Sequence, residues 1–440
     1  MKLSGWGRFP MIEASLESPR SEAEIKTKLS TGTIIARGNG RAYGDSAIGR
    51  DKTIDMRNFN HMLAFNQHDG ILEVEAGVLL SEIIDTFLPR GWFPFVTPGT
   101  KFVTIGGMIA SDVHGKNHHK EGSMRSCVNW IDLLNPNGEI LRLSATQNAE
   151  LFDWTMGGMG LTGVILRAQI RLKQVSTGWI KQKTIVANNL DEIINQFEIN
   201  QSATYSVAWI DYLATGKSLG RSLLMLGEHA DQAHLPKSLL EDQYCQNRTT
   251  RYYMSFVPPF KVLNKTTVNA FNALYFWAGK RTTGTKFIQW NKYFYPLDSF
   301  DKWNRLYGRN GFAQFQCVLP LKSSKYGLKR LLEKTGEARQ GPFLAVLKRL
   351  GPQSGKFSFP MEGYTLAFDF PVTAATLDLM KKLDEITIEY GGRFYLAKDS
   401  RMSKKIFEES DSRVVDFRNM RQETATKKHF VSHQSDRLGL

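Results

Sequence analysis

A glycine-rich stretch at residues 98–122, PGTKFVTIGGMIASDVHGKNHHKEG, constrains the fold of this chain more than any other segment. It shows almost no helical period and no strand alternation, and its early glycines and proline predict a series of turns. Because glycine has no Cβ, backbone N–H groups there can approach a ligand closely. The threonine hydroxyls and the basic, histidine-rich end favour a cover over a large, partly anionic ligand. An ordinary glycine-rich surface loop is the alternative.

A second glycine-rich loop, RGNGRAYGDS at residues 37–46, follows a short buried strand predicted at residues 33–36. A strand that runs into glycine, asparagine and arginine can present hydrogen-bond donors to a pyrophosphate. Many tight turns have a similar composition, so this loop alone does not identify the ligand.

A third glycine cluster, GGMGLTG at residues 157–163, fits the dinucleotide pattern GxGxxG but not its structural context. In a Rossmann unit the pattern follows a strand and opens a helix. Here a helix predicted at residues 149–156 precedes it, and a strand predicted at residues 164–172 follows it. The expected acidic residue about twenty positions further on is also missing. We therefore reject a Rossmann unit and expect a loop packed closely against a ligand.

Composition limits the class of protein. A chain of 440 residues with 42% hydrophobic and 23% charged residues is typical of a globular enzyme with one large or two medium domains. The N-terminus lacks the apolar core of a signal peptide, and no run of about eighteen apolar residues occurs. The three scattered cysteines indicate neither disulfides nor a metal site. We expect a cytoplasmic protein, or one peripheral on a membrane.

The formal net charge of +14 allows an anionic membrane surface, a phosphorylated substrate or nucleic acid as partner. Residues 247–295 alternate basic and aromatic side chains, as lipid headgroup or single-stranded nucleic-acid sites do. No helix-turn-helix, RRM or zinc-finger pattern is present, so we expect no nucleic-acid partner. We predict that this segment is partly exposed and binds an anionic membrane. A core segment with solvated lysines is the alternative.

Two C-terminal strands are predicted to carry polar chemistry. Residues 313–318 read as a strand with Gln314 and Gln316 on one face. Residues 393–401, RFYLAKDSR, read as a strand that ends in Lys398. Strand alternation would place Leu396 beside Lys398, where it would desolvate the amine and lower its pKa. A surface pair of Lys398 with Asp399 is the alternative.

Together, these segments resemble the vanillyl-alcohol-oxidase-type (PCMH-type) FAD flavoproteins, and among them the decaprenylphosphoryl-β-D-ribose 2-oxidase group. The similar segments are the loop at 37–46, IASDVHGKNHH, residues 122–134, GGMGLTG and YLAKDSR. The resemblance extends over nearly the whole chain. It implies an α+β fold with a two-subdomain FAD-binding domain at 1–174. A substrate domain at 175–392 would contain a mixed or antiparallel sheet covered by helices. The segment at 393–440 would complete the FAD domain and the active site.

The resemblance also implies roles for individual residues. Lys398, Tyr43 and His114 would be catalytic. Substrate would be bound by Lys116, Gln314, Gln316, Lys348 and Lys398. FAD would be bound by Arg37, Gly38, Asn39, Gly40, Arg41, Ala42, Tyr43, Thr100, Thr104, Gly106, Gly107, Ser111, Val113, His114, Asn117, Gly160, Thr162, Ile165 and Tyr395. No metal is implied.

The implied reaction is FAD-dependent oxidation of the 2′-hydroxyl of a polyprenylphosphoryl-β-D-ribose to a 2′-keto sugar. This is the first half of an epimerisation to the arabinose donor for cell-envelope polysaccharide, and a short-chain reductase partner would complete it. Related lactone oxidases often carry GxGH with a flavin-linked histidine, but here Arg41 takes that position, which predicts non-covalent FAD. Ala367 stands where mycobacterial relatives have cysteine, which leaves the exact sugar lipid open. The alternatives are an aldonolactone or free-sugar oxidase of the same superfamily, or a basic binding protein without catalysis.

Overall fold

A small parallel sheet and a larger antiparallel sheet form the N-terminal part of the chain in the computed structural model, which describes residues 1–245, 252–253, 265–338 and 345–440. The small sheet has the order β3-β5-β4. The larger sheet has the order β10-β9-β11-β7-β6, with β8 also paired to β11. Their elements are β3 Ser15–Glu17, α1 Glu22–Leu29, β4 Ile34–Arg37, β5 Lys52–Asp55, β6 Met62–Asn66, β7 Ile71–Glu75, α2 Leu80–Phe87, β8 Trp92–Pro94, β9 Val128–Leu134, β10 Ile140–Ser144, α5 Ala149–Thr155 and β11 Val164–Gln174.

The glycine-rich stretch at 98–122 contains two short helices, α3 Ile105–Ala110 and α4 His118–Glu121. The expectation of turns alone was therefore wrong. Thr104 caps α3 by accepting a hydrogen bond from the Gly107 N–H at 3.3 Å. Ile105, Met108 and Ile109 are buried in the core at helical spacing, and this burial outweighs the low helix propensity of the two glycines.

A single eight-stranded sheet organises the middle of the chain, with order β16-β12-β14-β13-β19-β20-β18-β21. Every pairing in it is antiparallel, so the mixed alternative does not apply. Its strands are β12 Trp179–Ala187, β13 Tyr205–Ile210, β14 Ser222–His229, β16 Gly284–Gln289, β18 Phe312–Pro320, β19 Ala345–Leu350, β20 Gly363–Pro371 and β21 Arg393–Phe394.

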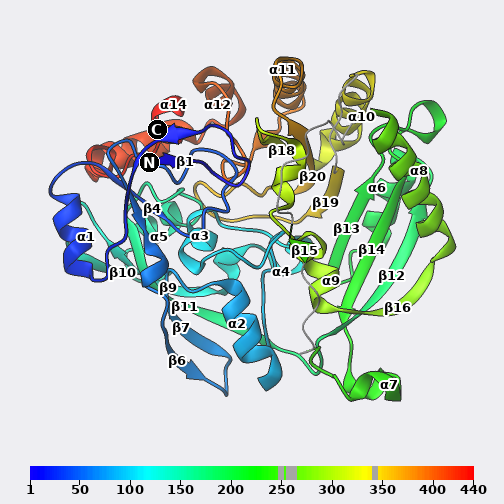
Figure 1. Cartoon of the computed structure of the whole chain (residues 1–440), viewed down its shortest axis with the longest axis horizontal. Helices are drawn as coiled ribbons and strands as arrows, with labels where there is room; N and C mark the ends of the chain where they lie inside the picture. Colours follow the sequence, from blue (N-terminus) through cyan, green and yellow to red (C-terminus); the bar gives the residue numbers. More distant parts are fainter. Residues whose placement is uncertain (246–251, 254–264, 339–344) are drawn as a thin grey trace.

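Three helices cover one face of this sheet, at the upper right of Figure 1: α6 Leu190–Ile199, α10 Leu321–Glu337 and α11 Ala374–Glu389. The remaining elements of this region are α7 Lys237–Leu240, β15 Tyr252–Tyr253, α8 Lys265–Arg281, α9 Trp290–Phe294 and β17 Phe300–Asp301. The helices bury alternate residues of the strands, such as Phe315 and Cys317 of β18 and Leu366 and Phe368 of β20. The residues between these therefore face the other side of the sheet, toward the N-terminal part of the chain.

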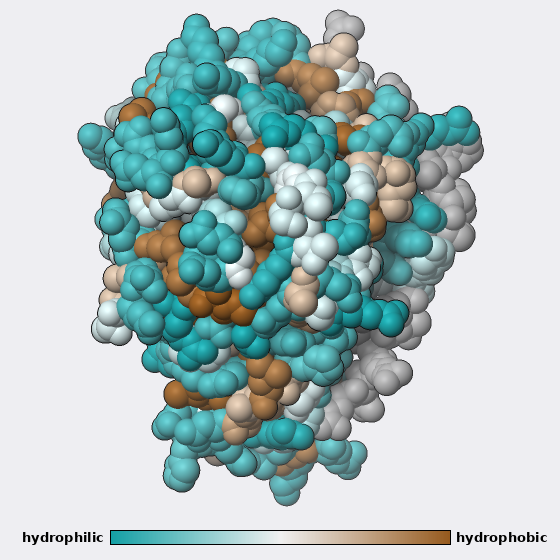
Figure 2. Space-filling model, turned by 90° about the vertical axis from the view of Figure 1, so that its left-hand side faces the viewer, coloured by the Kyte–Doolittle hydropathy of each residue, from teal (hydrophilic) through white to brown (hydrophobic). Residues whose placement is uncertain are grey.

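The C-terminal segment returns to the N-terminal sheets, and both termini lie on the same side in Figure 1. It carries α12 Lys404–Ser410, α13 Val414–Glu423 and α14 His433–Leu438, and the terminal hairpin at the other end pairs β1 Lys2–Leu3 with β2 Ile12–Glu13. The Ile34 N–H donates to His429 O at 2.8 Å, and the Val431 N–H donates to Ile34 O at 3.1 Å. This side of the molecule is mainly hydrophilic, with hydrophobic side chains gathered near its middle (Figure 2).

The fold is α+β, as predicted, and β9 and β10 form an antiparallel hairpin around residues 135–138. The GGMGLTG segment lies between α5 and β11, as expected from the rejection of a Rossmann unit. The exact domain limits at 174 and 392 stay predictions. Within the described part of the chain, no helix combines the length and apolar character needed to cross a bilayer.

Candidate active site

A cavity of about 320 Å³ lies between the glycine-rich loops and the open face of the eight-stranded sheet. Its volume falls in the range of small-molecule and cofactor sites. The residues predicted for the site that line it are Gly38, Asn39, Gly40, Arg41, Ala42, Tyr43, Thr100, Thr104, Gly106, Gly107, Ser111, Val113, His114, Gly160, Ile165, Gln314, Gln316, Lys348, Tyr395 and Lys398.

The loop after β4 forms one wall with its backbone. Among the described residues, the N–H groups of residues 39–42 have no hydrogen-bond acceptor, although the Asn39 side chain donates to Phe102 O at 2.8 Å. Gly40 has φ +62°, and a Cβ on Gly38 would lie 2.0 Å from Thr104 Oγ1. Unpaired N–H groups beside glycines, where no Cβ blocks the approach of a ligand, are suited to bind an anionic group.

His114 stands at the junction of this wall and the sheet. It is 5% exposed, and its ring packs against Tyr395 with 5.2 Å between centroids. Its Nε2 lies 3.3 Å from the Gln316 amide nitrogen, and its Nδ1 has no partner among the described residues. Burial, followed by the nearby Lys348 charge, holds the pKa of His114 well below its usual value. The histidine is therefore a neutral, orienting ring rather than a cation.

The open face of the sheet supplies the opposite wall, and its side chains follow from strand alternation. Gln314 pairs in register with Asp369, and Gln316 with Ala367, while Thr365 lies beside Lys348 of β19. The cavity therefore receives amides, a hydroxyl, a carboxylate and a lysine from three neighbouring strands. The expectation that both glutamines share one face is confirmed.

Lys398 enters the cavity from a turn, so the predicted strand over residues 393–401 was wrong. β21 ends at Phe394, and the Lys398 N–H donates to Tyr395 O at 2.9 Å. The turn brings Tyr395, Ala397 and Lys398 to the cavity, whereas Leu396 is a core residue that does not line it. Lys398 Nζ lies 3.6 Å from the centroid of the Tyr43 ring.

Three lysines lose solvation in or beside the cavity, and burial is the first cause of each pKa shift. Burial lowers the pKa of Lys348 to about 8. Burial, together with the Lys348 charge, lowers the pKa of Lys116 to about 7. The pKa of Lys398 is lowered to about 7. Burial is the main cause, the Asp369 charge opposes it by raising the pKa, and the Lys348 charge lowers the pKa. An amine with such a pKa can be neutral near physiological pH, as a general base must be.

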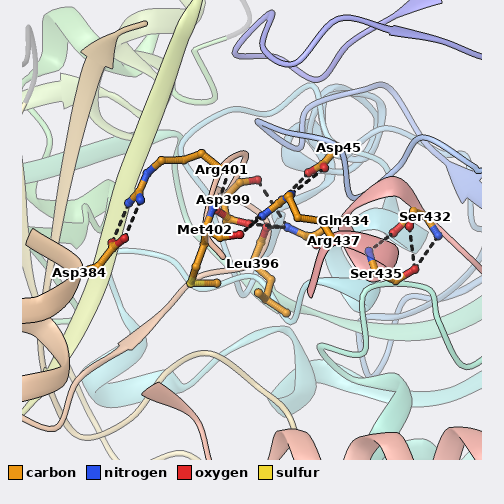
Figure 3. Close-up of polar contacts among 10 residues, drawn as sticks. All are labelled: Asp45, Asp384, Leu396, Asp399, Arg401, Met402, Ser432, Gln434, Ser435 and Arg437. Carbon is orange, nitrogen blue, oxygen red and sulfur yellow. Dashed lines mark hydrogen bonds and ion pairs between the residues drawn. The ribbon is translucent and has the colours of Figure 1, made fainter. Parts of the chain in front are cut away.

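An ion network holds the Lys398 turn against the loop at residues 37–46 (Figure 3). Arg437 of α14 donates from Nη2 to Asp45 at 2.7 Å and to Asp399 at 2.9 Å. Although burial favours the neutral acid, Arg437 keeps the pKa of Asp399 below its usual value. The Tyr43 N–H also donates to Ala397 O at 2.9 Å. The C-terminal helix thus joins the predicted cofactor loop to the predicted catalytic turn.

Four predicted site residues lie outside the cavity lining: Arg37, Lys116, Asn117 and Thr162. Arg37 turns away and donates to Ser4 O at 2.8 Å. The ammonium of Lys116 is held by Tyr293 O, and the Asn117 amide donates to Phe95 O at 2.7 Å. Thr162 Oγ1 lies 3.1 Å from Thr155 Oγ1. These side chains support the walls, and direct contact with a ligand stays a prediction for them.

The structure adds residues that the sequence did not single out. Trp6, Asp298 and Trp303 line the cavity from distant parts of the chain, and no local pattern marks them. Asp369 could have been found, because alternation along YTLAFDF places it on the same face as Thr365 and Ala367.

The cavity fits FAD, the cofactor implied by the sequence resemblance. Backbone N–H groups 39–42 suit a pyrophosphate, and the closely packed glycines of α3 leave room for a flat ring system. His114 Nδ1 and Gln316 offer polar groups at the end of the cavity where Lys398 lies. A buried unpaired nitrogen in a native site calls for such a partner.

Comparison with known proteins agrees with this fit. Residues 18–144 match the model of the FAD binding domain family. Over its whole length, the chain is 34% identical to decaprenylphosphoryl-β-D-ribose oxidase of Mycolicibacterium smegmatis, and the match covers 97% of that protein. It is 29% identical to an uncharacterised protein of Streptomyces coelicolor, over 82% of this chain and 100% of that one. It is also 25% identical to bovine L-gulonolactone oxidase, over 48% of this chain and 49% of that enzyme.

A full-length match at this identity shows membership in a family, and the matched FAD domain contains two of the glycine-rich segments that line the cavity, at residues 37–46 and 98–122. FAD is accordingly the cofactor. The chain belongs to the family of FAD-binding oxidoreductases that includes decaprenylphosphoryl-β-D-ribose oxidase.

Proposed function

We propose that the protein oxidises the 2′-hydroxyl of a polyprenylphosphoryl-β-D-ribose to the 2′-keto sugar, the first half of epimerisation to an arabinose donor. The observation that carries this proposal is the cluster of buried lysines in and beside the cavity of an FAD protein. The full-length relative named above is an oxidase of such a sugar lipid. A buried cationic site favours an anionic substrate, because the charges it holds are costly without a counter-charge.

The chain's own residues can perform the proton transfer that this oxidation needs. FAD, held by the loop at residues 37–46 and by α3, would supply the acceptor for the hydride of the carbinol carbon. The neutral amine of Lys398 takes the hydroxyl proton and becomes an ammonium. The Tyr43 ring lies 3.6 Å from that nitrogen and would stabilise the new charge by a cation–π contact. Gln314 and Gln316 would orient the sugar hydroxyls from the sheet face.

The substrate phosphate is assigned to Lys348, since lysine binds phosphate as a point charge. Lys348 lines the cavity, while Lys116 lies behind it against the Tyr293 ring, with Nζ 4.4 Å from the centroid. Lys116 would therefore add to the positive field rather than contact the phosphate.

Product analysis tests this proposal. The protein is incubated with a polyprenylphosphoryl-β-D-ribose, and the mixture is quenched with sodium borodeuteride. Deuterium at C2′ of the recovered pentose is expected, because only a ketone at that position takes up the label. Deuterium at another carbon, or none with an FAD-loaded protein, would contradict the proposed reaction.

An aldonolactone or free-sugar oxidase is the second candidate, and the similarity to L-gulonolactone oxidase over half of the chain favours it. Neutral lactones offer no counter-charge to the buried cation Lys348, so we place this function second. The same borodeuteride experiment with L-gulonolactone or D-arabinono-lactone separates the two.

We predict that FAD is held without a covalent bond. In the structure, Arg41 replaces the linking histidine and stacks its guanidinium 4.0 Å from the centroid of Trp6. Precipitating the purified protein with acid should release all yellow colour into the supernatant. A washed pellet that keeps its flavin would show a covalent link, and His114 would be the first residue to map by peptide mass spectrometry.

We also propose two partners for the protein. One is an anionic membrane surface, and the other is a short-chain reductase that reduces the ketone product. α8 packs on β14 through Val268 and Gly279 and exposes the side chains of Phe271, Leu274, Tyr275 and Trp277. Lys280 and Arg281 follow at its C-terminal end. An aromatic face next to basic residues is typical of membrane-surface helices.

Outside α8, the segment at 247–295 includes residues that the structure does not describe and residues that lie in the core. Arg248, Arg251, Phe256, Phe260 and Lys261 lie outside the described residues. Trp290, Tyr293, Phe294 and Tyr295 are core residues, so the core alternative applies to that end of the segment. Their rings pack around Phe93 and Tyr205.

We expect salt-sensitive binding to vesicles that contain phosphatidylglycerol, since each base near such a surface contributes about 1 kcal/mol. Leu274→Ser combined with Trp277→Ser should reduce cosedimentation severalfold. Tyr326→Ser removes an equally exposed ring from α10 and is the matched control. Equal binding of all three proteins, or no binding to anionic and neutral vesicles alike, would contradict the assignment.

A further inference from the structure

Asp369 of β20 is a buried carboxylate in the candidate active site that the reaction outlined above does not use. It is 3% exposed and lines the cavity. Its hydrogen-bond donor is the Gln314 amide. Among the described residues, no cationic nitrogen lies within ion-pair distance of it. A buried carboxylate without an ion pair is costly unless it serves a charge that appears during function.

Lys398 lines the same cavity, and its charge acts on Asp369. Both side chains line the same space, and neither is neutralised by a direct contact with the other. Burial raises the pKa of Asp369, while the Gln314 hydrogen bond and the Lys398 charge lower it. In turn, Asp369 raises the pKa of Lys398 against the effect of burial. Each of the two groups therefore influences the other's charge within the cavity.

The other groups around Lys398 come from four further elements. Tyr43, in the loop after β4, presents its ring face, and burial keeps its pKa well above the usual value, so the phenol is neutral. Lys348 of β19 adds a positive charge, whereas the His114 ring, which follows α3, is neutral. Gln314 and Gln316 of β18 are uncharged. Asp399, the next residue in the chain, is occupied by Arg437. The other carboxylate that lines the cavity, Asp298, accepts from the Lys101 N–H at 2.9 Å and is influenced by the Arg41 charge. Among the described side chains that line the cavity, Asp369 is thus the carboxylate whose charge acts on Lys398.

We propose that Asp369 is a positioning residue that stabilises the ammonium formed at Lys398 when the amine takes the proton of the substrate hydroxyl, and that Lys348 acts in the opposite sense. The inference rests on the proposed function for the identity of that hydroxyl. The proton moves from the carbinol oxygen to Lys398 Nζ, the hydride leaves to FAD, and Asp369 keeps its charge throughout.

Opposite shifts of the pH profile test this pairing. The base form of Lys398 is needed, so the rate of flavin reduction should rise with pH through the pKa of that amine. Asp369→Asn keeps the oxygen that accepts from Gln314 but removes the charge that raises the pKa, so the rise should move to lower pH by about one unit. Lys348→Met removes a charge that lowers the pKa, so the rise should move to higher pH.

The matched control is Asp378→Asn, which removes an exposed carboxylate of α11 that pairs with Lys382. It should leave the pH profile where it is. A variant that only damages the cavity would lower the rate at every pH without moving the profile. Unmoved profiles in both Asp369→Asn and Lys348→Met, or shifts of the same sign, would overturn the proposal.

A second readout does not depend on turnover or on the substrate. Lys398 acetylation by acetic anhydride in the FAD-loaded protein can be followed against pH by peptide mass spectrometry, because only the neutral amine reacts. The midpoint should fall in Asp369→Asn and rise in Lys348→Met, with the FAD spectrum and thermal melting used to confirm folded protein. If these midpoints move as expected while no sugar lipid reduces the flavin, the proposed function fails and the Asp369 inference stands. If the midpoints stay unmoved, the inference fails whatever the substrate.

Discussion

Replacing Lys398 by alanine should lower the rate of flavin reduction by roughly 100-fold or more, the usual scale for losing a positioned acid–base group. FAD should remain bound, because the groups that line its cavity on the other side come from the loop at 37–46 and from α3. Lys398→Arg should fail as well, since a guanidinium does not give up its proton near neutral pH. Stopped-flow reduction with saturating substrate measures both variants.

Lys405→Ala is the matched control for this experiment, because the Lys405 side chain is 82% exposed and pairs with Glu409 at 3.8 Å. Its reduction rate should equal that of the unchanged protein. A normal rate in Lys398→Ala would remove Lys398 from the mechanism and return it to a supporting role beside the Tyr43 ring.

Arg437→Met should destabilise the protein by about 3 kcal/mol or more, because it leaves the buried carboxylates of Asp45 and Asp399 without their shared cation. The Lys398 turn should also lose its fixed position against the loop that carries Tyr43. Chemical denaturation followed by tryptophan fluorescence gives the free energy of unfolding. Since Arg437 holds the pKa of Asp399 down in the folded protein, this stabilisation is present at neutral pH and is lost as the pH falls through that depressed pKa.

Arg50→Met is the control for Arg437→Met, because it removes an exposed ion pair to the same helix, α14. Arg50 and Asp436 of α14 lie 3.7 Å apart with side chains 50% and 44% exposed. Such a pair contributes about 1 kcal/mol or less. Equal losses of stability in Arg50→Met and Arg437→Met would show that the buried network has no special role.

Local patterns predicted those parts of the site that depend on neighbours in the sequence. Alternation placed Gln314 and Gln316 together on one face of β18. The strand before the loop at 37–46 and the loop itself were also identified from short-range signals. Turn-forming residues and side-chain periodicity determine these elements, and both can be read from a single short segment of the sequence.

Other features depend on pairing between distant segments and could not be read locally. Arg437 and Asp45 are 392 residues apart. Lys398 was placed on a strand, but the chain turns there, since the Tyr395 carbonyl accepts from the Lys398 N–H. Similarly, α3 forms despite its glycines because its apolar side chains are buried under the N-terminal sheet.

Anaerobic titration of the FAD-loaded protein tests the central claim most directly. A polyprenylphosphoryl-β-D-ribose should bleach the flavin absorbance within the time of mixing, whereas L-gulonolactone and free D-ribose at the same concentration should leave it unchanged. Bleaching by the free lactone or sugar, with none by the lipid-linked pentose, would contradict the account.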